Sequence, residues 1–574
     1  ASASAAALPA RPGDIPPDSP LLSDASTFGR GLYSHGDWSW AYVSAPREEL
    51  DDAELRVEGA LPDDLVGGTL WRNGPGRFER GDAAYKHMLD GDGFVYRVSL
   101  LGARSASLKG RFVRTAEYAE EDTADAVRYR GTFGTPKPGG VAANAFDLAT
   151  KNLSNTHVVA WGGRLLSLYE AGLPCELDPD TLECLTPQGD TLGGLLGESA
   201  GNAFVSTGVL PAELERKLGV GGWAFTAHPH IDPHTDRLCG WAWQSVPGQS
   251  KIRIRLFEWD REWNLRSTRD AELEDCQTAP HDFGVTAGAY VFVQNRMDLS
   301  PLAFVAGLRG AGECLISRPD LPVRLHVVPR DPALPARVAD GPTRSFEIHT
   351  AFAHDGPATG PGAATVEPGA DPTQWATAYS AGWDELAPGS FLGEWGSAEP
   401  FSFELGGSSL SPDFRNIPAT LLWRYEVNAA TGEVRRRVAP GAEGICIDHP
   451  HVNPLYEGKA ECRYVYASIS NEIARAGPPC GYVRVDVKSG TREVWWAGNR
   501  TFCEELVVVP KAGCSAAGEG DVWLLGIACD HSVDAEGGES CLLVLDGARL
   551  AEGPVARVWL GERLPHGLHG CMQL

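Results

Sequence analysis

The stretch that decides the fold class is residues 482–496, which read YVRVDV, then KSG, then TREVWW. Apolar and polar residues alternate on both sides of KSG, and KSG itself has the composition of a tight turn. Such alternation turns one face of an extended segment toward a core and the other toward solvent. The sequence therefore predicts an antiparallel hairpin here.

The same pattern recurs along the chain. Residues 422–427 and 433–437 flank a polar turn in the same way, and similar turns lie at 178–180, 232–236 and 260–263. The clearest helical pattern covers only residues 211–218, between Pro211 and Gly219. Many hairpins and few helices predict an all-β protein and favour a β-propeller, although the spacing is too irregular to count blades.

The chain divides into a tail and one long domain. Residues 1–50 are rich in Ala, Ser and Pro and carry little periodic pattern, so we expect an N-terminal tail. Its acid-free start resembles the end of a transit peptide, and an artificial start of the chain explains it equally well. No linker divides the remainder, so residues 51–574 are predicted to form a single domain, with an irregular loop at 356–372.

Composition excludes several classes of function. The formal net charge is −26 and Lys and Arg form no cluster, which argues against nucleic-acid partners because phosphate binding needs a basic surface. No apolar run approaches about eighteen residues, so a membrane-spanning helix is not expected. The thirteen cysteines contain no CxxC pair and favour free thiols over a disulfide framework.

Four histidines, far apart in the sequence, carry the chemistry that we expect. They are His228 in TAHP, His281 in PHDF, His349 in FEIHT and His569 in PHGLHG. Only a fold that brings distant strands to one axis, such as a propeller, could join them. Neutral imidazoles suit first-row metals, and four of them would leave two positions open on an octahedral ion. A closed tetrahedral zinc site is the competing interpretation.

These contexts resemble the iron-ligand signatures of the carotenoid cleavage oxygenases, and the resemblance extends over roughly residues 50–574. The segments LWRNGPG at 70–76 and LDGDGFV at 89–95 resemble the opening signatures of the same family. The resemblance implies a seven-bladed β-propeller, with loops and short helices forming a dome over the metal site. It also implies that His228, His281, His349 and His569 hold Fe(II).

In this family, three glutamates orient three of the metal-binding histidines by accepting their second N–H. LYEA at 168–171 places the first at Glu170, and CEELVVVP at 503–510 places the third at Glu504, with Glu505 where the family generally has Pro. The second position holds Asp448, whose shorter side chain must approach differently or act through water. Three further histidines are assigned to structure or surface: His230, His449 and His451.

The resemblance implies oxidative cleavage of a conjugated C=C bond of a carotenoid or apocarotenoid by O2, giving two carbonyl products. The chain has no GxSxG or P-loop motif, in keeping with a reaction that needs neither. A stilbenoid-cleaving oxygenase remains an alternative. So does a non-catalytic polyene-binding protein, which Asp448 favours, as does Phe352 where the family tends to place Asn.

The resemblance also implies an apolar polyene partner, and the 17 Trp and 19 Phe could line a tunnel for it. Because such substrates are stored in membranes, we expect a peripheral membrane contact, with residues 302–308 and 192–196 as candidates. The expected location is the plastid, and otherwise the cytoplasm.

Overall fold

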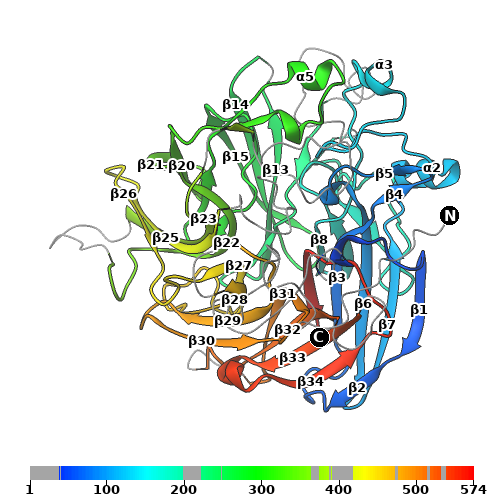
Figure 1. The fold of residues 1–574 in the computed structure, drawn as a ribbon. Coiled ribbons are helices and arrows are strands. Elements are labelled where there is room, and N and C mark those ends of the chain that lie inside the picture. Colours follow the sequence, from blue (N-terminus) through cyan, green and yellow to red (C-terminus); the bar gives the residue numbers. More distant parts are fainter. Residues whose placement is uncertain are drawn as a thin grey trace, which may run out of the picture.

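The computed structural model is a β-propeller of seven blades around one axis, as predicted (Figure 1). It describes residues 38, 40–197, 221–246, 248–363, 374–386, 389–390, 418–471, 476–513, 518–531 and 538–574. The predicted helix at 211–218 lies outside these ranges, as does most of the predicted loop at 356–372. Within them, no helix is long and apolar enough to cross a membrane.

Each blade is an antiparallel sheet of three to five strands. From the axis outward, the first blade consists of β35 (His569–Gln573), β3 (Thr69–Arg77), β6 (Asp92–Gly102), β7 (Ser105–Phe112) and β1 (Glu49–Glu54). The second consists of β8 (His157–Trp161), β9 (Arg164–Leu168) and β10 (Cys175–Leu177). The third consists of β11 (Ala224–Phe225) with β12 (His230–Asp232), then β13 (Arg237–Ser245), β14 (Lys251–Trp259) and β15 (Leu265–Glu274).

The other four blades follow in chain order, and the last also takes in β2. They are β16 (Gly284–Val285), β17 (Ala289–Gln294), β20 (Pro322–Pro329) and β21 (Arg337–Thr343); β22 (Phe346–Asp355), β23 (Trp375–Trp383), β25 (Thr420–Asn428) and β26 (Val434–Val438); β27 (Cys446–His451), β28 (Tyr464–Asn471), β29 (Gly481–Asp486) and β30 (Thr491–Trp496); and β31 (Thr501–Pro510), β32 (Val522–Asp530), β33 (Glu539–Asp546), β34 (Pro554–Trp559) and β2 (Arg56–Gly59).

The predicted hairpins are confirmed. Strands β29 and β30 pair with Val483 opposite Val494, and β25 pairs with β26. Val483, Val485 and Val487 are fully buried, whereas Arg484 between them is only half-buried. The alternation in the sequence therefore arises because successive side chains lie on the two faces of a blade that packs against its neighbours.

Two blades join strands from opposite ends of the chain. In the first, β35 pairs with β3, which sets His569 opposite Asn73. In the last, β2 pairs with β34, with Val57 opposite Val558. Figure 1 shows this closure as red strands beside blue ones. The ring of blades is thus held shut by main-chain hydrogen bonds in two adjacent sheets.

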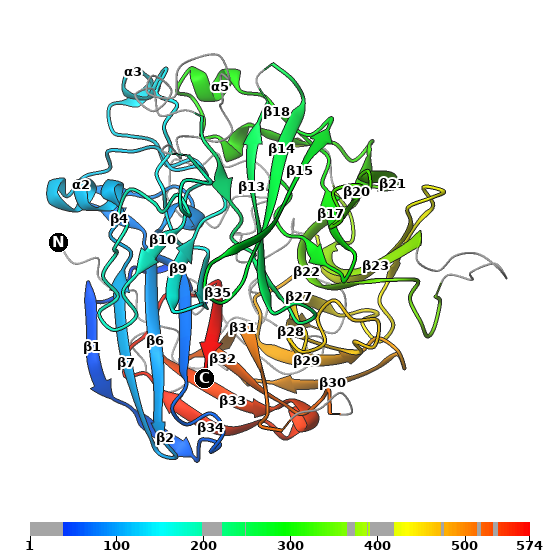
Figure 2. The ribbon, with the colours of Figure 1, turned by 180° about the vertical axis from the view of Figure 1, so that it is seen from behind.

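Short elements above one end of the axis form the predicted dome (Figure 2). The described helices are α2 (Ala116–Ala124), α3 (Gly140–Asn144) and α5 (Leu302–Val305), with the 3-10 turns η2 (Trp40–Tyr42), η3 (Met88–Asp90) and η4 (Gly312–Cys314), while η6 (Gly547–Glu552) lies on the last blade. Small sheets add β4 (Glu79–Arg80) with β5 (Ala83–Ala84), and β18 (Met297–Leu299) with β19 (Leu315–Ser317) and β24 (Gly389–Ser390).

One expectation about the surface needs correction. Leu192 and Leu196 lie in a hydrophobic core cluster, so residues 192–196 do not supply an apolar surface patch. Trp38 and Tyr42, inside the predicted tail of residues 1–50, are buried, because they pack against Phe78 and Phe502. Residues 1–37 and 39 lie outside the described ranges. The cysteines within those ranges are free.

Candidate metal centre

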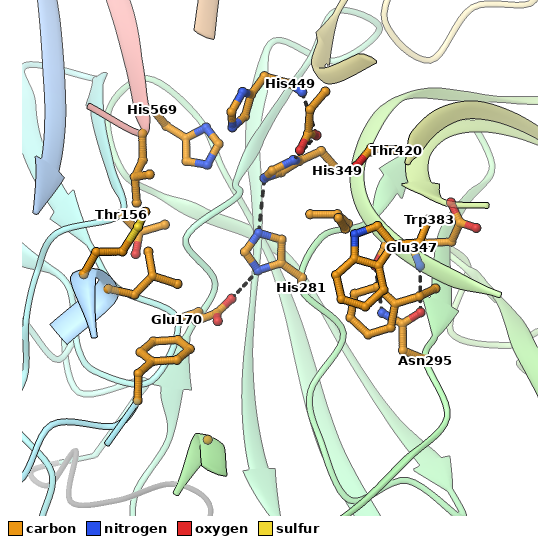
Figure 3. Close-up of a pocket in the computed structure, with 18 of the residues that line it drawn as sticks. Thr156, Glu170, His281, Asn295, Glu347, His349, Trp383, Thr420, His449 and His569 are labelled. Carbon is orange, nitrogen blue, oxygen red and sulfur yellow. Dashed lines mark hydrogen bonds and ion pairs between the residues drawn. The ribbon is translucent and has the colours of Figure 1, made fainter. Parts of the chain in front are cut away.

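The four predicted histidines lie on or beside the innermost strands of the blades, at the propeller axis, and Figure 3 shows three of them: His281, His349 and His569. His228 lies just after β11, His281 just before β16, His349 on β22 and His569 at the start of β35. Nε2 of His228 lies 3.0 Å from Nε2 of His281, which lies 3.3 Å from Nε2 of His349. The ring centroid of His569 lies 4.6 Å from the ring centroid of His228 and 5.2 Å from that of His349.

Carboxylates fix which ring nitrogens carry the protons. Glu170 lies 2.5 Å from Nδ1 of His281, and Asp448 lies 2.8 Å from Nδ1 of His349. A neutral imidazole that donates from Nδ1 has its lone pair on Nε2. The Nε2 lone pairs of His281 and His349 therefore face each other at 3.3 Å. A metal ion, or a proton shared between the two nitrogens, would offset their repulsion, and nitrogens at about 2.1 Å from one ion have roughly this separation. The residues present fit a bound metal.

Burial and neighbouring charges reinforce this arrangement. Burial first, and the adjacent imidazoles second, hold the pKa of His228 well below its usual range. Burial also lowers the pKa of His569 far more than Glu505 raises it. At His281, burial lowers the pKa but Glu170 raises it above the usual value, so a proton competes with a metal at this ring. Removing the metal would therefore leave a partly protonated cluster.

Asp448 reaches His349 directly, so the shorter side chain needs no bridging water. The pairing of β27 with β28 shifts register between Asp448 and His451, which marks a bulge. A bulge bends a strand and redirects its side chains. Although burial raises the pKa of Asp448, its interactions with His349 and His449, including hydrogen bonds from the His349 ring and the His449 backbone N–H, lower it well below the usual range, so it stays an anion.

The carboxylate that contacts His569 is Glu505, which corrects the expected place of Glu504. Oε1 of Glu505 lies 2.7 Å from Nδ1 of His569. Glu504 instead accepts the backbone N–H of Gly567 at 2.7 Å and pairs with Arg72 at 2.8 Å. The register of β31 shifts between Cys503 and Leu506, so alternation cannot assign faces to the two acids. Glu504 anchors the segment before His569.

His228 is held differently from the other three. Within the described ranges no carboxylate contacts its ring. The residue before it is fixed instead by His157 at the start of β8, whose Nδ1 lies 2.8 Å from the carbonyl of Ala227. Nε2 of His157 lies 3.4 Å from the carbonyl of Gly570, the residue after His569. His157 thus lies between the segments that carry His228 and His569 and can donate to either carbonyl, and sequence analysis did not single it out.

The three histidines assigned to structure or surface have different roles. His230 is structural, since its ring contacts Asp282 at 3.1 Å and pairs with Glu457. His451 is 41% exposed, yet its Nε2 lies 2.6 Å from Oε1 of Glu505, so two imidazoles share that carboxylate. His449 lies in the centre itself, where one of its nitrogens falls within 4.8 Å of ligand atoms of His349 and His569. His451 therefore fits its assignment to structure or surface, whereas His449 lies beside two of the expected ligands.

A cavity of about 430 Å³ opens onto the histidines and is lined mainly by apolar atoms. Its aromatic lining residues are Trp38, Tyr42, Phe133, Tyr169, Trp243, Phe346 and Trp383. The wall also contains Glu347, which accepts a hydrogen bond from Tyr425 at 2.6 Å and pairs with Arg436 at 3.1 Å. The cavity therefore suits an apolar ligand held beside the metal position.

Phe352 lies outside this cavity. Its ring stacks on Tyr379 with centroids 4.6 Å apart, inside a core cluster between blades. The register of β22 shifts between Thr350 and Phe352, which turns the side chain away from the axis. Phe352 therefore does not form part of the cavity wall.

Comparisons with known proteins agree with this geometry. A family model described as retinal pigment epithelial membrane protein matches residues 43–573. The chain is similar to apocarotenoid-15,15'-oxygenase of Synechocystis, with 30% identity over 94% of this chain and 96% of the relative. It is also similar to carotenoid cleavage dioxygenase 7, chloroplastic, of rice, with 28% identity over 93% of this chain and 90% of the relative.

Solved structures match this chain over nearly the same residues. The crystal structure of the cobalt-substituted Synechocystis enzyme superposes with a TM-score of 0.78 at 29% identity, and covers 94% of this chain and 99% of the other.

Proposed function

Because the chain belongs to the retinal pigment epithelial membrane protein family, whose members compared above include carotenoid and apocarotenoid oxygenases, we propose that it is a non-haem Fe(II) dioxygenase. Its reaction cleaves one conjugated C=C bond of a carotenoid or apocarotenoid with O2. Both bonds between the two carbons break, each carbon takes one oxygen atom, and two carbonyl products form. One O2 supplies both atoms, so no external reductant is needed.

The observation that carries the proposal is the convergence of Nε2 lone pairs at the axis. His228, His281, His349 and His569 would hold the iron. When bound, the iron would supply the redox chemistry with O2. Glu170, Asp448 and Glu505 keep three of the rings in the tautomer and orientation that binding needs, which raises ligand basicity.

The cavity supports the choice of substrate class. It is mainly apolar, and its three acids are each paired, Glu347 with Arg436, Glu170 with His281 and Asp448 with His349, so a long hydrocarbon can lie there without leaving a charge unpartnered. The aromatic walls would exclude water and hold the polyene beside the metal. The direct contact of Asp448 with His349 and the position of Phe352 remove the two features that favoured a non-catalytic protein.

A peripheral membrane contact is part of the proposal. Helices α3 and α5 lie side by side in the dome, joined by a hydrogen bond from the N–H of Phe146 to the carbonyl of Val305 at 2.8 Å (Figures 1 and 2). Exposed apolar side chains gather there: Val141 50%, Phe146 83%, Leu302 79% and Leu308 64%. Such a patch would take up an apolar substrate from a lipid surface. We also propose a plastid location, supported by the printed name of the rice relative.

The test combines metal analysis with a product assay. The purified protein should contain one iron per chain, and with a panel of carotenoids, apocarotenoids and stilbenoids under ¹⁸O2 it should give two labelled carbonyl fragments. A protein that binds zinc in place of iron, or that releases no carbonyl product from any of the panel, contradicts the proposal. Cleavage of stilbenoids alone would retain the chemistry and overturn the substrate class.

A further inference from the structure

We propose that His449 is a fifth imidazole ligand of the metal centre and faces the metal from the cavity side. The inference rests on the proposed function, because it assumes that His349 and His569 bind a metal. It goes beyond that function by adding a nitrogen ligand.

The position of the ring supports this role. His449 lines the cavity together with His281, His349 and His569. Its ring centroid lies 4.9 Å from that of His349 and 5.5 Å from that of His569. Imidazoles that share one ion at about 2.1 Å place their centroids roughly 4.5 to 6.5 Å apart. The separations of His449 are therefore those of a ring bound to the same metal.

The backbone of His449 adopts an uncommon conformation that directs its ring toward the centre. His449 has a φ of 49°, in the left-handed region that non-glycine residues seldom adopt. Such a conformation is strained and persists where the surroundings hold it. His449 lies inside the bulged part of β27, and its N–H donates to Asp448 at 2.7 Å. The same bulge therefore delivers the carboxylate of Asp448 to His349 and the ring of His449 to the centre.

The hydrogen bonds of the His449 ring leave Nε2 available to bind a metal. The hydroxyl of Ser468 donates to the carbonyl of Asp448 at 3.0 Å, so its oxygen can accept from Nδ1 of His449 at 3.4 Å. This tautomer has its lone pair on Nε2, as in the other ligands.

The inference has a chemical consequence. Four imidazoles leave two open positions on an octahedral ion, whereas five leave one. His449 would then reduce the room for exogenous ligands on the cavity side of the resting centre.

The test compares metal coordination in the wild type and in His449→Asn, because asparagine tolerates the left-handed backbone. With Co(II) bound, we expect the variant to change the intensity of the visible absorption bands, to lose one imidazole by X-ray absorption, and to bind Co(II) at least about tenfold more weakly in a chelator competition. His449→Phe, which has no ligand atom, should behave in the same way.

The matched control is His354→Asn, a buried histidine on β22 whose ring bonds the carbonyl of Asp355. It should keep the wild-type spectrum and affinity. If both His449 variants melt as the wild type does and keep its imidazole count and affinity, the inference is overturned while the proposed function stands. If the wild type itself binds no metal, the proposed function fails first.

Discussion

The inner strands of the propeller and the dome above them both border the cavity, but they differ in the side chains that they present. On the inner strands, hydrogen bonds hold polar rings in place: three of the four histidines have a carboxylate at 2.5–2.8 Å, and His157 lies between the segments that carry His228 and His569. In the dome, short helices display apolar side chains such as Leu302 to solvent. The comparison teaches that polar contacts on rigid strands fix the positions of the rings, whereas the exposed apolar surface is carried by short helices and loops.

The largest effect is expected from a ligand on the inner strands. His281→Ala removes a nitrogen whose ring is also held by Glu170, so iron content and cleavage activity should both fall by more than about 100-fold. Metal analysis and a product assay on the folded variant measure this. The control is His326→Ala, a buried histidine that contacts Gln294 far from the axis. A full equivalent of iron in His281→Ala would show that the ligand assignment is wrong.

Deletion of residues 566–574 should abolish iron binding and lower the melting temperature, because it removes His569 and the strand that closes the first blade. Chelating the intact protein should lower the melting temperature in the same direction, since metal binding stabilises only the folded chain. Thermal melts with and without chelator measure both. A truncated protein that keeps its iron, or melts at the wild-type temperature, contradicts the closure.

An intermediate effect is expected where a ligand remains but loses its carboxylate. Asp448→Ala leaves His349 without its partner and should lower iron affinity or activity by about 10- to 100-fold. His451→Ala should be milder, because Glu505 would still contact His569 and be held by Arg72 at 3.0 Å. Iron competition assays on the two variants rank them. The reverse order would mean that the shared carboxylate of Glu505 matters more than the direct pair.

The smallest effect on chemistry is expected in the dome. Leu302→Ser with Phe146→Ser removes two exposed apolar side chains, so binding to lipid vesicles should fall roughly tenfold or more. Turnover of a detergent-solubilised substrate should stay unchanged, because neither residue lines the cavity. Leu101→Ser, a 60% exposed position on the outer end of β6, is the control. Equal vesicle binding by both variants would remove the dome patch from the proposal.

The sequence predicted what depends on local pattern. Alternation in β29 and β30 predicted their pairing, and the contexts of the four histidines identified the rings that the fold gathers. The directions of the remaining site side chains depend on β-bulges, which the sequence pattern does not predict. Glu505, His449 and Asp448 all lie where a register shifts, so alternation does not tell which way they point. His157 and Trp38 were missed because their contacts come from distant segments, and only the assembled fold reveals them.

The pairing of β35 with β3 also has a consequence for how the protein is made. His228 is synthesised long before His569, and at roughly 5–20 residues per second tens of seconds separate the two on a ribosome. Over that interval, the first blade lacks its innermost strand and the centre lacks a ligand. A metal at this centre would therefore gain its full set of ligands only after translation has passed β35. Nascent or prematurely terminated chains would remain open rings, exposed to chaperones and proteases, which gives the cell a means to distinguish finished molecules from unfinished ones.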